Sequence, residues 1–78
     1  MIIETGADLK RARQALGWSV YYMADKLELG GNTENGARRV RAIESGKETL
    51  WGPIRVAVEG FLREAGITTL EGARNGRD

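Results

Sequence analysis

Three arginines lie close together near the middle of the chain, at Arg38, Arg39 and Arg41. A guanidinium group is always charged and holds five N–H donors in a planar fork, which matches the paired acceptors of guanine and of phosphate. Two apolar residues, Val40 and Ile43, stand among them at helical spacing. This pattern predicts a short helix with an apolar face packed inward and a basic face turned toward a nucleic-acid groove.

We expect the arginines to differ in role. Arg38 lies near the helix start and has no acidic residue four positions later, so we expect it to contact guanine O6 and N7. Arg41, one turn further on, is the second candidate for a base contact, and Arg39 is expected to bind a phosphate. Asn35 and Thr33 are further candidates for base contacts if the segment before the helix enters the groove.

Three other residues are candidates for contacts to the DNA backbone. Ser19 is a good N-cap, and the free amides of the helix that it begins can bind a phosphate. Lys47 follows the expected end of the arginine-bearing helix, and Tyr21 has a hydroxyl at the tip of a long side chain. Each also has a simpler interpretation, as a plain helix cap, a surface lysine and a tyrosine at the edge of the core.

Composition excludes several kinds of chemistry. The 78 residues include no cysteine and no histidine, which excludes a disulfide scaffold, a zinc finger, a thiol nucleophile and a histidine general base. The two serines stand at an expected helix cap and a helix end, with no base available to activate them. The pair Gly30-Gly31 is not followed by the lysine of a phosphate-binding loop. We therefore expect no enzymatic activity, no metal and no cofactor.

A length of 78 residues predicts a single domain, with little room for a second core. The net charge is only +1, so the total charge does not favour nucleic acid and only its local arrangement does. No apolar run approaches the roughly 20 residues that a helix needs to span a bilayer, and the N-terminus does not resemble a signal peptide. We expect a cytoplasmic protein that does not associate with membranes.

The first two expected helices are marked by capping residues. Thr5 and Ser19 are good N-caps and predict helices over residues 6–16 and 20–28. Gly17 is the expected end of the first, because glycine tolerates the left-handed conformation that often follows a helix. With so few residues between them, the two helices must cross steeply.

The start of the third helix is harder to place. Residues 29–36 contain three glycines and two asparagines, which predicts a loop. Asn32 or Thr33 would cap the helix early, whereas Gly36 would delay it, so the start is open by about three residues. The expected end is at Gly46.

A fourth helix is expected to open at Gly52-Pro53, since proline at the first helical position costs no hydrogen bond, and to end at Gly66. We expect residues 1–66 to form the domain. Residues 67–78 would follow as a segment that allows a short fifth helix, capped by one of two adjacent threonines, and then a disordered tail. The side chains of Trp18 and Trp51 are most simply interpreted as core residues.

The ordered set of signals resembles the lambda-repressor-like domains, the Cro/CI-type or XRE family of helix-turn-helix proteins, over about residues 5–62. It resembles the short phage and bacterial members most. The residues that carry the resemblance are Leu9, Arg13, Leu16-Gly17-Trp18-Ser19, Met23-Ala24-Asp25-Lys26-Leu27, Val40-Arg41-Ala42-Ile43-Glu44-Ser45-Gly46-Lys47 and Leu50-Trp51-Gly52-Pro53-Ile54. The resemblance implies an all-α domain of four to five helices whose third helix enters the major groove of double-stranded DNA.

Other implications concern single positions. The resemblance implies a largely buried ion pair between Arg13 and Glu44, with a structural role. Val20 stands where family members commonly have a glutamine that contacts the DNA backbone, so that contact is absent here. The glycine-rich segment 29–36 makes the expected turn before the third helix longer than is usual in the family.

These features together predict a sequence-specific regulator of transcription. A module of this size makes few contacts, so we expect a homodimer on an inverted repeat, acting as a repressor of its own phage- or plasmid-like operon. The candidate dimer contacts are apolar residues of the C-terminal part: Phe61, Leu62, Ile67 and Leu70. The alternatives are an antitoxin, which would add a partner protein, and a protein-interaction module that has lost DNA binding.

Overall fold

The computed structural model describes residues 3–29 and 31–70, except for the side chain of Thr33, and this part of the chain contains four helices and no strand. The helices are α1 (Gly6–Leu16), α2 (Val20–Leu27), α3 (Thr33–Glu44) and α4 (Gly52–Glu64). The all-α class is thus confirmed. None of these helices is long and apolar enough to cross a membrane.

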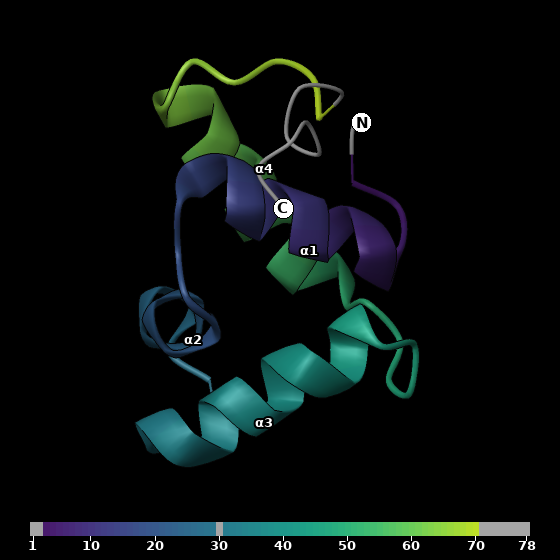
Figure 1. Cartoon of the computed structure of the whole chain (residues 1–78), viewed down its shortest axis with the longest axis vertical. Helices are drawn as coiled ribbons and strands as arrows, with labels where there is room; N and C mark the ends of the chain where they lie inside the picture. The colour runs from purple at the N-terminus through teal and green to yellow at the C-terminus, as the bar shows by residue number, and fades with distance from the viewer. Residues whose placement is uncertain (1–2, 30, 71–78) are drawn as a thin grey trace.

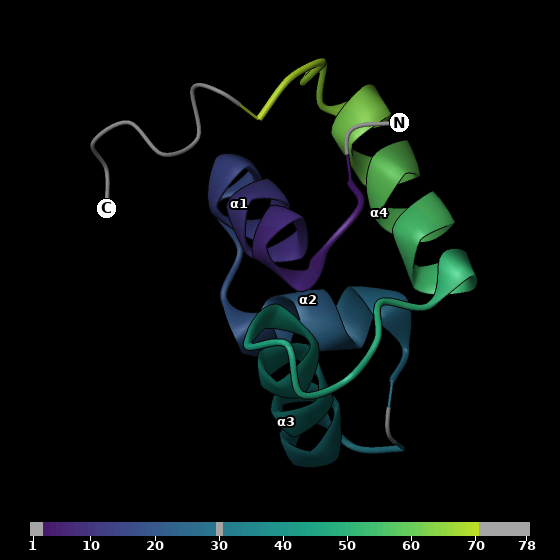
Figure 2. The ribbon, with the colours of Figure 1, turned by 90° about the vertical axis from the view of Figure 1, so that its right-hand side faces the viewer.

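The helices form two groups, which both views of the ribbon show (Figures 1 and 2). Helices α1 and α4 pack together at one end of the molecule, and α2 and α3 lie at the other. The axis of α2 is steeply inclined to those of α1 and α3. Because α3 contacts both α2 and α1, one side of it is covered while the other forms the end of the molecule.

Local capping explains the bounds of the first two helices. The hydroxyl of Thr5 accepts a hydrogen bond from the Asp8 N–H, and Gly17 closes α1 with a φ of 75°. The Ser19 hydroxyl caps α2 by accepting from the N–H of Tyr22 at 3.0 Å. Helix α2 ends one residue earlier than predicted, because Glu28 adopts a left-handed conformation with a φ of 58°.

Of the starts that the sequence leaves open for the third helix, the early one at Asn32 is confirmed and the late one at Gly36 is wrong. Asn32 caps α3 by accepting from the Asn35 N–H at 2.8 Å, so residues 33–36 form the first turn of that helix and the connection is short. Gly36 lies inside this helix. Only glycine fits at this position, because a Cβ would come within 2.7 Å of the Leu29 carbonyl oxygen and 2.9 Å of the Ala24 Cβ. This glycine allows α2 and α3 to approach closely, and it does not break the helix.

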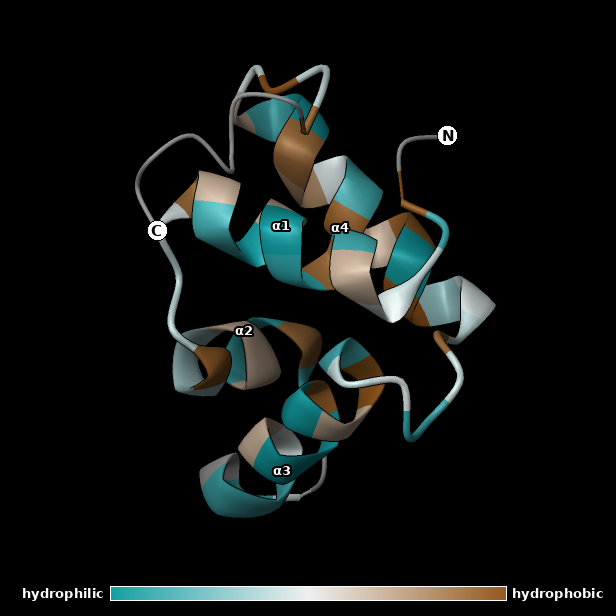
Figure 3. Cartoon of the chain, turned by 45° about the vertical axis from the view of Figure 1, so that its right-hand side comes forward, coloured by the Kyte–Doolittle hydropathy of each residue, from teal (hydrophilic) through white to brown (hydrophobic). Residues whose placement is uncertain are grey.

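The core consists of apolar residues from all four helices and both flanking segments (Figure 3). Those buried completely or nearly so include Ile3, Leu9, Ala12, Met23, Val40, Ile43, Val58 and Leu62. Trp18 is half-buried and packs against Phe61, with the ring centroids 5.3 Å apart. The prediction that Trp51 belongs to the core is wrong, since it is 52% exposed.

The described part of the C-terminal segment contains no fifth helix. Residues 67–70 are not helical, but Ile67 packs against the core and Leu70 is buried in it. The segment therefore covers the end of the bundle formed by α1 and α4. The tail that the sequence predicts to be disordered begins beyond Leu70 and lies outside the described residues.

Candidate nucleic-acid interface

Helix α3 holds its arginines outward because its other face is anchored. Ala37, Val40 and Ile43 are buried almost completely, so the helix cannot rotate about its axis without exposing them. Arg38 and Arg41 are exposed on the opposite side, and Arg39 is half-buried at its edge. We define this exposed side, with these three arginines, as the arginine face.

Arg41 is held by a residue from α2. Its Nη2 donates a hydrogen bond to the Tyr21 hydroxyl at 3.2 Å, and its guanidinium carbon lies 5.3 Å from the centroid of the Tyr21 ring, within the range of a cation–π contact. The hydrogen bond from Arg41 to Tyr21 raises the pKa of Arg41 above its ordinary value, so the group is a cation at any pH of interest. The sequence predicted a separate DNA contact for each residue and missed that they contact one another.

Arg39 has different partners. Its Nε donates to a carboxylate oxygen of Glu48 at 3.2 Å, and its guanidinium lies over the exposed ring of Trp51, 4.8 Å from the centroid. The sequence predicted a free phosphate ligand at Arg39, whereas the structure shows a cation already paired with an acid. Glu48 and Trp51 were missed because they lie beyond the end of α3, where helical spacing gives no information.

Arg38 is the least restrained of the three arginines. It is exposed and forms no hydrogen bond or ion pair with any residue that the structure describes. Asn35, which the sequence placed in a loop before the helix, lies exposed in the first turn of α3. Thr33 is the first residue of that helix, and its side chain is not among the described groups. The start of α3 thus belongs to the same end of the molecule as the arginine face.

The predicted backbone contacts lie at helix ends. The Ser19 hydroxyl accepts the hydrogen bond that caps α2. A phosphate at this helix end would therefore be bound by the other N–H groups of the first turn, which have no partner within the helix. Lys47 is exposed just after α3, where its backbone N–H donates to the Ala42 carbonyl oxygen at 2.8 Å. Its side chain is therefore available while its backbone is fixed.

An ion pair fixes the C-terminal end of α3. Arg13 of α1 donates from Nε and Nη2 to the two carboxylate oxygens of Glu44, at 2.7 and 3.0 Å, and from Nη1 to the Trp18 carbonyl oxygen at 3.0 Å. The side chains of Arg13 and Glu44 are only 14% and 8% exposed. The ion pair that the resemblance implies is therefore present, and it ties α1, the turn before α2 and the last residue of α3 together.

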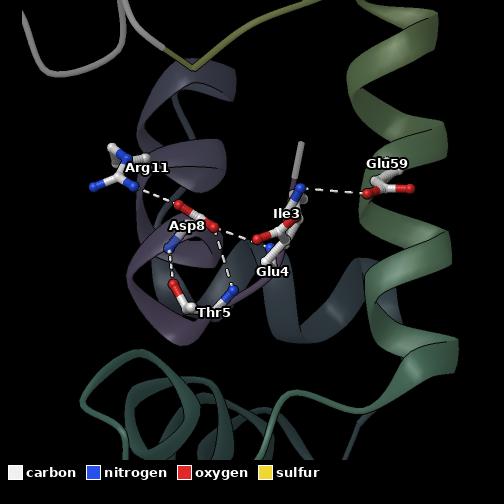
Figure 4. A network of polar contacts seen from close by, with 6 residues as sticks. All are labelled: Ile3, Glu4, Thr5, Asp8, Arg11 and Glu59. Carbon is white, nitrogen blue, oxygen red and sulfur yellow. Dashed lines mark hydrogen bonds and ion pairs between the residues drawn. The ribbon is translucent and has the colours of Figure 1, made fainter. Parts of the chain in front are cut away.

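The N-terminal end of α1 gives α3 a second support. A Cβ at Gly6 would lie 1.8 Å from the Ile43 carbonyl oxygen, so the backbones of α1 and α3 meet there at a distance that only glycine permits. The adjacent chain is fixed by Asp8, which accepts from the backbone N–H groups of Glu4 and Thr5 and pairs with Arg11 (Figure 4).

This network favours the ionised form of Asp8. Burial raises the pKa of the Asp8 carboxyl, but the hydrogen bonds from the backbone of Glu4 and Thr5 and the nearby Arg11 guanidinium together lower it below its ordinary value. In the same network the Ile3 N–H donates to Glu59 of α4 at 3.3 Å (Figure 4). This network is structural, because it holds the chain entering α1 against α4.

The predicted dimer contacts are in part wrong. Leu62 is completely buried and Leu70 is buried, so their side chains fill the core of one copy and are not available to a second. Phe61 and Ile67 are half-buried, and Phe61 packs on Trp18 with the Lys26 ammonium 5.7 Å from its ring centroid. In the part of the chain that the structure describes, the exposed large apolar side chains lie elsewhere, at Trp51 and Val56 of the α4 region and at the two tyrosines of α2.

No metal-binding cluster of histidine, cysteine, aspartate or glutamate occurs among the residues that the structure describes. Comparison of the chain with models of known protein families found no match, and no curated protein and no solved structure matches it either. The resemblance to lambda-repressor-like domains therefore stays a prediction from the sequence.

Proposed function

We propose that the protein is a sequence-specific double-stranded DNA-binding regulator of the helix-turn-helix type, resembling the lambda-repressor-like domains. The observation that carries this proposal is the arginine face, where two exposed guanidinium groups project from a helix that is anchored on its buried side. An α-helix fits the major groove, and guanidinium groups match the two acceptors that guanine presents there.

The elements around α3 divide the contacts. In this proposal Arg38 and Arg41 contact base edges, while the N-terminus of α2 and the side chain of Lys47 contact phosphates on either side of the groove. Arg39 is paired with Glu48 in the free protein, so it contributes to DNA binding only when a phosphate competes with that carboxylate. Phosphate contacts supply affinity and register, and base contacts supply sequence preference.

Two copies are expected on one operator, because a single arginine face reaches few base pairs. Such a dimer would bind an inverted repeat with half-sites about one DNA turn apart, and occupancy of a promoter would repress transcription. The buried positions of Leu62 and Leu70 move the expected dimer contact away from those side chains.

A test of this proposal starts with selection of bound duplexes from a random pool, in which an enriched inverted repeat is the expected result. Affinity for the enriched duplex is then measured against salt. Each phosphate contact should add about −0.9 to the slope of log K against log salt. A protein that enriches no sequence, or whose binding does not respond to salt, does not have the proposed function.

A protein-interaction module, as in an antitoxin that binds a partner protein, is the second candidate. It is favoured by an apolar groove of about 270 Å³ between α2 and the start of α4. The groove is lined by Lys26, Leu27, Leu29, Trp51, Pro53, Ile54 and Ala57. Binding of a protein in this groove would bury apolar surface and respond weakly to salt, so the same titration separates the two candidates.

A further inference from the structure

We propose that Tyr21 is a positioning residue that fixes the direction of the Arg41 guanidinium, and that sequence preference at one base pair depends on it although Tyr21 itself does not read the base. Tyr21 has this role only if the arginine face binds DNA as proposed above. The role differs from that of a phosphate ligand, which the sequence alone predicts for this tyrosine.

Tyr21 contacts Arg41 through both its hydroxyl and its ring. The hydrogen bond from Nη2 to the Tyr21 hydroxyl holds one corner of the guanidinium group, and its carbon lies over the Tyr21 ring, 5.3 Å from the centroid. Tyr21 stands in the first turn of α2 and Arg41 in the third turn of α3, so the contact joins the two helices. A long side chain that is already ordered loses less conformational entropy when it binds.

The donors that remain point to base reading. A guanidinium has five N–H donors, and Tyr21 takes one of them. The others stay on an exposed side chain whose direction is fixed. Direction matters for guanine because O6 and N7 lie in one plane at one edge of the base, whereas a phosphate accepts hydrogen bonds from many directions.

The chemistry of the partner also matters. The hydrogen-bond partner of Arg41 is a hydroxyl and not a carboxylate, so Arg41 forms no ion pair with a described residue. The partner of Arg39 is the carboxylate of Glu48, which compensates that charge, and Arg38 has no such partner among the described residues. Of the three arginines, only Arg41 therefore has a side-chain hydrogen bond without an ion pair, and Glu34 and Glu44 act on it only from a distance.

The experiment uses the full chain and the duplex enriched from a random pool. Tyr21→Phe keeps the ring and removes the hydroxyl, and Arg41→Ala removes the reader. The matched control is Tyr22→Phe, since Tyr22 is the adjacent exposed tyrosine of α2 and packs its ring on Trp18. Binding to the enriched duplex and to duplexes with single substitutions is measured for each variant, and for the double variant.

We expect Tyr21→Phe to reduce discrimination about 2- to 10-fold at a single base pair, the one at which Arg41→Ala abolishes it. Adding Tyr21→Phe to Arg41→Ala should change nothing further, because the hydroxyl acts only through Arg41. The Tyr22→Phe control should keep the preference of the original protein, and the thermal midpoints of the two phenylalanine variants should be equal.

Other results overturn the proposal. Equal weakening of all duplexes by Tyr21→Phe would make Tyr21 a phosphate ligand, and unchanged discrimination would show that its hydroxyl has no part in recognition. If the original protein selects its sequence normally in either case, the proposed function stands while the role of Tyr21 falls. If the original protein enriches no sequence, both fall.

Nuclear magnetic resonance of the free protein measures the mobility of the Arg41 side chain, which would not change if Tyr21 only stabilised the fold. The Arg41 Nε–H group should be ordered in the original protein and in Tyr22→Phe, and should become more mobile in Tyr21→Phe. An Arg41 side chain that is equally mobile in all three would contradict the positioning role.

Discussion

Helix α3 forms two Arg–Glu ion pairs in very different surroundings. Its last residue, Glu44, is paired through two hydrogen bonds with Arg13 in a place where both side chains are nearly buried. Its Arg39 is paired through one hydrogen bond with Glu48, where the side chains are 32% and 45% exposed. The first pair lies where α3 packs against α1, and the second lies at the arginine face.

The difference in burial gives the two Arg–Glu ion pairs different roles. Removing one member of a buried pair leaves an unpaired charge in a medium that solvates it poorly, whereas exposed pairs contribute about 0–1 kcal/mol and exchange readily with water or salt. The pair of Arg13 and Glu44 can therefore fix the position of α3. The pair of Arg39 and Glu48 can open when a phosphate arrives.

The largest expected effect on stability comes from the ion pair between Arg13 and Glu44. Arg13→Ala should lower the free energy of unfolding by about 3–5 kcal/mol, because the Glu44 carboxylate loses its partner while it stays nearly buried. Urea denaturation measures this loss. As a control, replacing both members with apolar residues of similar size should cost much less. A loss below 1 kcal/mol for Arg13→Ala would remove the contrast between the two pairs.

The close approach of α2 and α3 gives the next effect. Gly36→Ala should destabilise the protein by about 1–3 kcal/mol, because the new methyl group meets a carbonyl oxygen of the backbone and the Ala24 side chain. Gly60→Ala is the matched control inside α4. The nearest atom that its methyl group meets is Arg63 Nη2, at 3.8 Å, so this variant should be about 0.5–1 kcal/mol more stable than the original protein. Thermal unfolding that ranks the two variants in the opposite order would contradict the packing described for α3.

The smallest effect on stability is expected on the arginine face. Glu48→Gln should change the free energy of unfolding by less than about 1 kcal/mol, yet it should raise DNA affinity about 2- to 5-fold for all sequences alike, because it frees Arg39 and removes a negative charge near the phosphates. Glu64→Gln, at the end of α4, is the control with the same change in net charge. Unchanged affinity in Glu48→Gln would place Glu48 and Arg39 away from the DNA.

Features set by neighbours in the chain could be predicted from the sequence. The caps Thr5 and Ser19 and the stop at Gly17 fixed α1 and the start of α2, because each acts on backbone groups within a few residues. The buried face of α3 followed from the spacing of Val40 and Ile43. Helical spacing and caps likewise predicted the all-α class and three exposed or partly exposed arginines on one helix.

Features that depend on distant residues could not be predicted. Gly36 has the composition of a loop residue, and only the position of Leu29 and Ala24 shows that it is needed inside a helix. Apolar character did not distinguish Leu62, which is buried, from Trp51, which is exposed. The contact between Tyr21 and Arg41 joins residues 20 positions apart, and no local pattern indicates it.

The most direct test of the arginine face compares Arg38→Ala with Lys47→Ala on duplexes selected by the original protein. We expect Arg38→Ala to lose about 1–3 kcal/mol of discrimination at one base pair. Lys47→Ala should weaken binding to all duplexes alike and make the salt slope shallower by about 0.9. Equal losses on every duplex from both variants would show that Arg38 does not read bases and would contradict base recognition by the arginine face.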